Sequence, residues 1–148
     1  MNYLNKAFEF IRETDSADFE GEKSEELIVN AETYLGLAFP DEYKNFLREF
    51  GCGDLNGIEI FGLINDKFES NSIPDAIAIT SKERRDSNLN TNFLLIANSS
   101  EYYYALDLRK GSEFEVRVVE IIPSEKISEY PIAANSFGEF LCKQFDIL

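Results

Sequence analysis

The chain has 148 residues, of which 44% are hydrophobic and 14% aromatic, which is enough apolar material for one domain and too much for a disordered acidic segment. Its 28 acidic residues outnumber its 14 basic residues, so the formal net charge is −14 at pH 7. This negative charge repels nucleic acid and anionic lipid, so we expect the protein to bind neither. The charge either attracts a basic protein partner or serves only to keep the protein soluble.

Two helices are predicted in the first quarter of the chain. The first runs from Tyr3 to Arg12, because apolar side chains recur there at helical spacing. The second begins after Ser24, a residue type that caps helices, and ends at Gly36, which suits the left-handed conformation of a helix end. The acidic segment between them, TDSADFEGEKSEE, is predicted to be a loop. Its carboxylates are either solvated or contact a basic partner.

The stretch LAFPDEYKNFLREFGCG, residues 37 to 53, has the start and stop signals of a third helix. Pro40 fits the first turn because it lacks an N–H group that would be unpaired there. Four apolar side chains then recur at i, i+3, i+4 and i+7, which predicts a stripe facing a core. They are Tyr43, Phe46, Leu47 and Phe50. The glycines at positions 51 and 53 end this helix.

The rest of the chain is predicted to form a sheet and a closing helix. The segment GIEIFGL alternates as a half-buried strand does, and the segment from Ile73 to Arg85 fits a helix or a strand, of which we favour the helix. Runs at residues 92–97, 102–108 and 114–122 predict an antiparallel meander. Ser136 and Glu139 have the spacing of a capping box. This order predicts a single α+β domain over residues 1–148, with an antiparallel sheet packed against N-terminal helices and a C-terminal helix.

The composition argues against an enzyme. Without histidine, the chain has no Ser-His or Cys-His nucleophile system and lacks the commonest metal ligand. Its glycines form no phosphate-binding fingerprint. Carboxylate pairs such as Asp54 with Glu59 keep acid–base hydrolysis as a distant third alternative. We expect no catalysis, no cofactor and no metal site.

The cysteines and the N-terminus indicate the compartment. Cys52 and Cys142 are far apart and form no C-x-x-C pair, which is typical of a reducing environment. No apolar run approaches the length of a membrane span. The first residues carry charges where a secretory signal has an uncharged apolar segment. We expect a cytoplasmic protein, and a monomer in preference to an oligomer.

The segment from residue 37 to residue 53 resembles the signature of the SUKH superfamily. The similarity is carried there by a proline, a spaced tyrosine, phenylalanine and leucine, and a glycine stop. The strand YYALDL and the closing segment SFGEFL also look like the pattern of this family, so the resemblance spans residues 24 to 142. The resemblance implies that the residues of the signature have structural roles. These residues are Pro40, Tyr43, Phe46, Leu47, Gly53, Leu106, Phe137, Phe140 and Leu141.

The resemblance implies binding rather than catalysis. Bacterial SUKH proteins are mostly immunity proteins that bind and block a cognate toxin, often a nuclease. Others, including fungal regulators of cell-wall synthesis, are interaction scaffolds. An acidic protein is suited to cover the basic active site of a nuclease, which must attract nucleic acid. The leading hypothesis is therefore an immunity protein for a basic toxin, and the alternative is a regulatory or scaffold module.

Strand alternation suggests where such a partner binds. If the apolar residues of each strand face the core, one outer sheet face presents two aromatic side chains among three carboxylates, a composition typical of binding patches. These residues are Glu59, Phe61, Tyr103, Asp107 and Glu115. The alternative is that the terminal helix covers this face and the carboxylates are only solvated edges.

Overall fold

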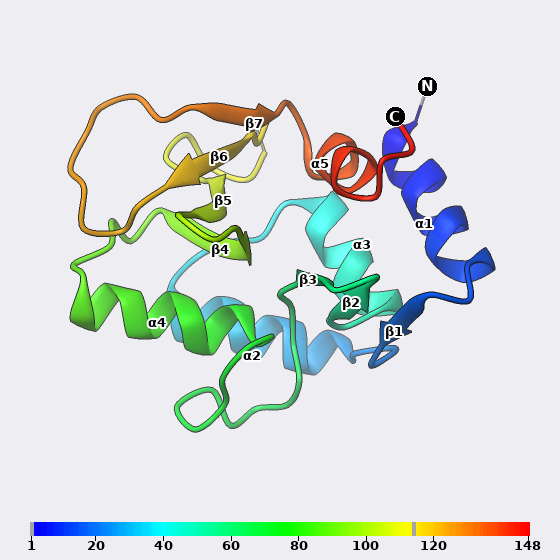
Figure 1. The fold of residues 1–148 in the computed structure, drawn as a ribbon. Coiled ribbons are helices and arrows are strands. Elements are labelled where there is room, and N and C mark those ends of the chain that lie inside the picture. Colours follow the sequence, from blue (N-terminus) through cyan, green and yellow to red (C-terminus); the bar gives the residue numbers. More distant parts are fainter. Residues whose placement is uncertain (1, 114) are drawn as a thin grey trace.

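Five helices and two antiparallel sheets make up the part of the chain that the structure, a computed structural model, describes, residues 2–113 and 115–148 (Figure 1). The helices are α1 (Tyr3–Glu13), α2 (Glu25–Leu35), α3 (Asp41–Glu49), α4 (Ala76–Asp86) and α5 (Phe137–Gln144). The strands are β1 (Ala17–Phe19), β2 (Gly53–Leu55), β3 (Ile58–Ile60), β4 (Phe93–Asn98), β5 (Tyr103–Asp107), β6 (Val118–Ile121) and β7 (Ile132–Ala134). The predicted α+β class is confirmed, and one buried apolar core joins all the helices.

The helix boundaries follow the predicted capping residues. The Ser24 hydroxyl accepts a hydrogen bond from Leu27 N at 3.1 Å, and the Ser136 hydroxyl accepts one from Glu139 N at 3.1 Å. Gly36 ends α2 with φ of 68°, a conformation that other residues rarely adopt. Pro40 lies one position earlier than expected, as the N-cap of α3 rather than within its first turn.

The stripe on α3 is the centre of the core. Tyr43, Phe46 and Leu47 are completely buried, and the Tyr43 ring makes an edge contact with the Phe137 ring of α5 at 5.2 Å between centroids. Burial raises the pKa of Tyr43 well above its usual value, so the hydroxyl keeps its proton and is a donor. It donates to the carbonyl oxygen of Phe61 at 2.8 Å.

Phe61 joins the two sheets. It directly follows β3, and its N–H donates to the carbonyl oxygen of Ile96 in β4 at 2.8 Å. Both Ile60 and Phe61 have buried side chains, so the alternation of β3 ends at Ile60. The prediction that Phe61 lies on an outer face is therefore wrong, because the chain leaves the strand there and enters the core.

The three-stranded sheet, in the order β1-β2-β3, includes two strands, β1 and β2, that the sequence did not predict. The tight turn between β2 and β3 contains Asn56 and Gly57, both with positive φ, which sets Leu55 opposite Ile58. β1 lies in the segment predicted to be a loop. It pairs with β2 because Gly53 has no side chain: a Cβ atom there would lie 2.3 Å from the Asp18 carbonyl oxygen.

The four-stranded sheet contains the predicted meander. Its order is β4-β5-β6-β7, with β7 added beyond the three expected strands. β6 begins at Val118, later than predicted, and Phe114 lies outside the described residues. The register of β4 shifts between Leu95 and Ala97, and the buried Thr80 hydroxyl of α4 accepts from Leu95 N at 3.0 Å. The α4 helix therefore lies against this sheet, as Figure 1 also shows.

Helices cover both faces of the four-stranded sheet. Tyr103 and Tyr104 are consecutive in β5, so their side chains point to opposite faces. The Tyr103 hydroxyl donates to Glu83 of α4 at 3.0 Å, and the Tyr104 ring packs against Phe140 of α5 at 4.9 Å. The expected open face next to Tyr103 is thus lined by α4 rather than by the terminal helix.

The first and last helices pack together, which brings the C-terminal end of the chain close to the start of α1 (Figure 1). Gly138 permits this approach, since a Cβ atom there would lie 2.6 Å from Leu4 N. Within residues 2–113 and 115–148, the structure contains no helix with the length and apolar character needed to cross a lipid bilayer.

The Tyr43 hydroxyl can be tested by removing it alone. Tyr43→Phe leaves the buried Phe61 carbonyl without its donor, and we expect it to lower the free energy of unfolding by about 1–2 kcal/mol in urea denaturation. The control is Tyr34→Phe, at a side chain that is 40% exposed, which should change the stability by less than about 0.5 kcal/mol. Equal stability of Tyr43→Phe and the wild type would contradict this role for the hydroxyl.

Candidate protein-interaction surface

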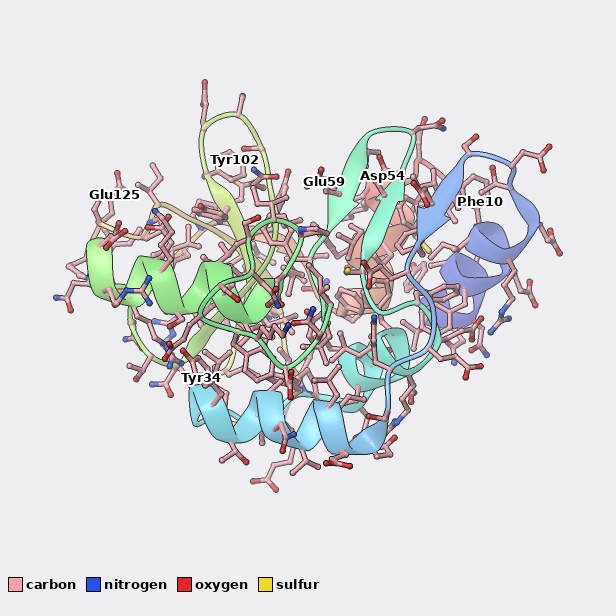
Figure 2. All side chains as sticks on the ribbon, turned by 90° about the horizontal axis from the view of Figure 1, so that it is seen from below. Phe10, Tyr34, Asp54, Glu59, Tyr102 and Glu125 are labelled. Carbon is pink, nitrogen blue, oxygen red and sulfur yellow. The ribbon has the colours of Figure 1, made fainter. Side chains whose placement is uncertain are left out.

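Three carboxylates lie side by side across the three-stranded sheet. The strand register places Asp18 opposite Asp54, and Asp54 opposite Glu59, so one residue from each strand contributes to a line that we call the acidic row. Figure 2 labels Asp54 and Glu59 on their neighbouring strands. Directly opposed residues have Cβ atoms about 5 Å apart, so the three charges are close neighbours.

The acidic row is held in place by the other face of the sheet. On that face Phe19, Leu55 and Ile60 pack into the core, and a shift of one residue would bury the carboxylates instead. None of the three carboxylates has an ion-pair partner among the described residues, although Glu20 nearby is paired with Lys23 at 2.8 Å. Like charges directly opposite one another destabilise a sheet. The row therefore costs the isolated protein some stability.

A shallow cavity of about 330 Å³ lies beside the acidic row and is also lined by Cys52 and Pro74. Burial, and then the charge of Glu20, raise the pKa of Cys52 to about 12, so this thiol is neutral and unreactive at physiological pH. Among the residues that the structure describes, no group of three or more His, Cys, Asp or Glu side chains is arranged to hold a metal ion. The described residues of this surface thus offer negative charge and no reactive thiol.

The five predicted partner-binding residues do not form one surface. Glu59 belongs to the acidic row in the three-stranded sheet, whereas Phe61 is fully buried. Tyr103 is half-buried and bonded to Glu83, and burial together with this carboxylate raises the pKa of Tyr103 to about 12. Asp107 and Glu115 both line a separate cleft, without a hydrogen bond or ion pair between them. The prediction of one shared face is wrong because β3 belongs to a different sheet from β5 and β6.

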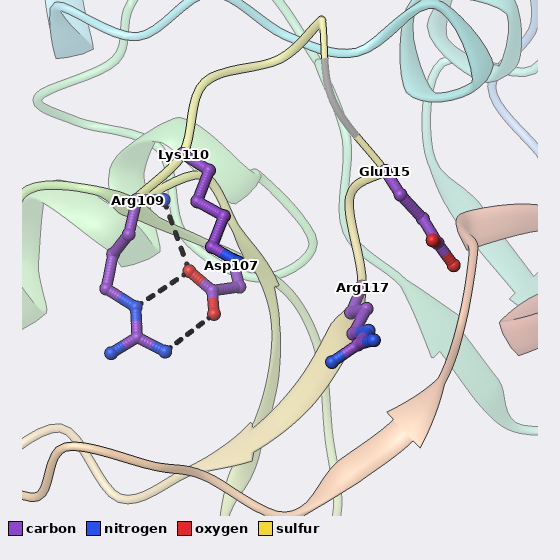
Figure 3. A pocket seen from close by; sticks show the side chains of 5 residues that line it. All are labelled: Asp107, Arg109, Lys110, Glu115 and Arg117. Carbon is purple, nitrogen blue, oxygen red and sulfur yellow. Dashed lines mark hydrogen bonds and ion pairs between the residues drawn. The ribbon is translucent and has the colours of Figure 1, made fainter.

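The cleft that contains Asp107 and Glu115 has a volume of about 290 Å³ and is also lined by Arg109, Lys110 and Arg117 (Figure 3). Asp107 is engaged by Arg109 through two side-chain hydrogen bonds, of 2.9 Å to Oδ1 and 2.7 Å to Oδ2. Partial burial raises the pKa of Asp107, but the hydrogen bonds from Arg109 outweigh this and hold it below its ordinary value. Asp107 is therefore not a free charge for a partner.

Arg109 is a structural anchor between β5 and the segment that precedes β7. Its guanidinium group lies over the Phe93 ring at 5.2 Å and the Tyr130 ring at 5.5 Å, and it donates to the Ser128 carbonyl at 2.9 Å. Asp107 orients this guanidinium group by accepting its two side-chain hydrogen bonds. The pair therefore ties β4 and β5 to the segment that precedes β7.

The sequence predicts the acidic segment that contains Asp18 to be a loop that is either solvated or contacts a basic partner, so sequence reasoning missed the strand that carries Asp18, and it missed Arg109 altogether. Asp18 lies in a three-residue strand, too short for alternation to be visible in the sequence. The Asn-Gly pair at 56 and 57 is a strong hairpin signal, and it alone would have placed Asp54 opposite Glu59. Arg109 is adjacent to a predicted turn, and no local pattern shows that two aromatic rings lie beneath it.

The sequence matches the model of a known protein family. A family model described as SUKH_6, SMI1-KNR4 cell-wall, matches residues 25–141, which is most of the chain. The chain therefore belongs to the SUKH superfamily. The signature residues are part of the framework: Tyr43, Phe46 and Phe137 share the aromatic core, and Gly53 permits the pairing of β1 with β2.

The Asp107–Arg109 pair predicts a pH-dependent loss of stability in Asp107→Asn. The pKa of Asp107 is depressed in the folded state, so the stabilisation is present above the unfolded pKa of about 4 and is lost as the pH falls through the folded value. Because the pair is partly exposed, we expect the variant to be less stable by about 1 kcal/mol at pH 7 in urea denaturation, and the difference to shrink at pH 3.

The matched control is Asp66→Asn, at an exposed carboxylate without an ion pair among the described residues. It should unfold like the wild type at pH 7. An Asp107→Asn protein that is as stable as the wild type at pH 7 would show that the Arg109 contact contributes nothing.

Proposed function

We propose that this protein is an immunity protein that binds a basic protein toxin, with a nuclease as the favoured target, and blocks its active site. Membership of the SUKH superfamily supports a binding role of this kind. The observation that carries the proposal is the acidic row: three unpaired carboxylates in register, on a chain with a net charge of −14. Both the toxin as the partner and the nuclease activity of that toxin belong to the proposal.

The mechanism is electrostatic attraction followed by occlusion. The active site of a nuclease attracts a polyanion, so its entrance is lined with cations, and the acidic row offers opposite charges on a rigid sheet. Bringing cations against the row also removes the repulsion between Asp18, Asp54 and Glu59. The net charge accelerates the first encounter, by roughly 10-fold or more at low salt. Speed is useful to an inhibitor that must act before the toxin does.

The same proposal includes a cytoplasmic monomer without catalytic activity. Both cysteines are buried, and burial raises the pKa of each thiol, which suits neither nucleophilic catalysis nor a redox role. In the described part of the chain, Asp54 and Glu59 are cross-strand neighbours, and no histidine or activated nucleophile lies in the cavity that they line.

A regulatory or scaffold role is the second candidate. It is favoured by the description of the matching family, which refers to the cell wall. In that case the acidic row would bind a basic segment of a host protein instead of a toxin. The two candidates share the surface and differ in the partner, so the identity of the partner separates them.

The experiment uses the product of the neighbouring gene as the binding partner, with the triple variant Asp18→Asn, Asp54→Asn, Glu59→Gln. We expect the affinity to fall at least tenfold, mainly through slower association in surface plasmon resonance, and the wild-type affinity to weaken as salt rises. The same variant should be about 0.5–1 kcal/mol more stable, because the repulsion is gone. Loss of binding with a gain of stability is the pattern of a functional surface.

The control is the triple variant Glu69→Gln, Glu101→Gln, Glu125→Gln, which removes three exposed charges elsewhere. It should retain nearly all of the affinity at 150 mM salt, where distant charges are screened over roughly 8 Å. Equal losses in both triple variants would mean that the net charge, and not the acidic row, determines binding. A wild-type protein that does not bind the neighbouring gene product would remove the toxin hypothesis.

A further inference from the structure

A second concave surface lies where the N-termini of α3 and α5 meet the connection between β5 and β6. We call it the α3–α5 groove; its volume is about 430 Å³, and it is distinct in chemistry from the cleft around Arg109. It is lined by Pro40, Asp41, Glu42, Leu106, Ser112, Glu113, Glu115, Val116, Asn135, Ser136 and Phe137.

The floor of the groove is apolar. Leu106, Val116 and Phe137 are each at most 9% exposed, and Pro40 is buried beside them. These side chains belong to the core, so the floor is rigid. An occupant must therefore bring an apolar portion that covers this floor and excludes water from it.

The rim of the groove is acidic. Four carboxylates line it and no lysine or arginine does. Glu42 is half-buried and accepts from Gly138 N at 3.0 Å, and Asp41 lies 3.9 Å from Lys44 with a side chain that is 95% exposed. Glu113 and Glu115 have no ion-pair partner among the described residues. The two helix N-termini contribute roughly half a positive charge each, which is much less than the four carboxylates.

Glu115 lines both the cleft around Arg109 and the α3–α5 groove. Figure 3 shows its side chain extending away from Asp107 and Arg109, toward the segment that joins β7 to α5. Arg117 lies between Glu115 and that ion pair in the same view. Glu115 is thereby available to a cation that enters the groove.

We propose that the α3–α5 groove binds one arginine side chain of a protein partner. An arginine has a three-carbon stem that packs on an apolar floor and a planar guanidinium head that donates hydrogen bonds to two carboxylates at once. A lysine would match the charge but would bind one carboxylate as a point charge, and an anion would be repelled. The partner is thus a protein with an exposed arginine that projects from its surface.

This inference rests on the proposed function only for the identity of the partner. The acidic row supplies attraction over a flat surface, whereas the groove supplies a pocket for one buried anchor, the kind of contact in which binding energy concentrates. The site itself can be tested without the partner.

The probe is the blocked tripeptide acetyl-Gly-Arg-Gly-amide, titrated into the ¹⁵N-labelled protein. We expect saturable shifts of the backbone amides of Ser112, Val116 and Phe137, with a dissociation constant on the order of a few millimolar. The citrulline tripeptide has nearly the same shape without the charge, and should shift these amides at least fivefold less at equal concentration. The lysine tripeptide should bind more weakly than the arginine tripeptide.

The variant Glu113→Gln, Glu115→Gln should reduce the affinity for the arginine tripeptide at least fivefold. Its control is Glu125→Gln, Glu129→Gln, which removes two exposed carboxylates from another loop and should leave the affinity unchanged. Both substitutions lie at exposed positions, so the variants should fold, and their unchanged amide spectra away from the groove will show it.

Several results would overturn the proposal: equal shifts with the citrulline tripeptide, tighter binding of lysine, no saturable shift, or shifts confined to the acidic row. The outcome is separable from that of the proposed function. If the tripeptide binds and the neighbouring gene product does not, the groove stands and the toxin hypothesis fails. If the gene product binds and the tripeptide does not, the toxin hypothesis stands and the groove proposal fails.

Discussion

The structure depends on the backbone of Phe61, whose carbonyl oxygen and N–H group are both hydrogen-bonded. Its carbonyl oxygen accepts from the Tyr43 hydroxyl of α3, and its N–H donates to Ile96 of β4. Both contacts are inside the core, where an unpaired peptide group is costly. The helical layer, the end of the small sheet and the start of the large sheet are therefore fixed relative to one another at a single residue.

Most SUKH signature residues belong to this framework, and three of them, Pro40, Leu106 and Phe137, also line the α3–α5 groove. Tyr43, Phe46 and Phe137 contact one another in the aromatic core, and Gly53 lets β1 approach β2. Family membership thus accounts for the fold, while the choice of partner lies with exposed residues. The acidic row and the α3–α5 groove both stand on this framework: the row because Gly53 permits its third strand, the groove because Phe137 forms part of its floor.

The charges of the molecule fall into three kinds with different roles. In the acidic row the three carboxylates repel one another and have no ion-pair partner among the described residues. The charge of Asp107 is neutralised by an ion pair with Arg109, whose guanidinium group lies over the rings of Phe93 and Tyr130. In the groove the carboxylates surround an apolar floor, which favours one long cationic side chain over a diffuse positive surface. Net charge alone does not distinguish these cases, because the surroundings of each carboxylate decide its role.

The sequence by itself determined the helices, because caps such as Ser24 and stripes such as that of Tyr43 act within a few residues of the chain. It also determined the α+β class, the meander, the family and the acidic character. Only the tertiary structure decided that Phe61 turns inward, that Asp18 joins a sheet and that Arg109 neutralises Asp107. These outcomes depend on contacts between segments far apart in the chain, and a strand of three residues is too short to show in its own pattern which neighbours it will have.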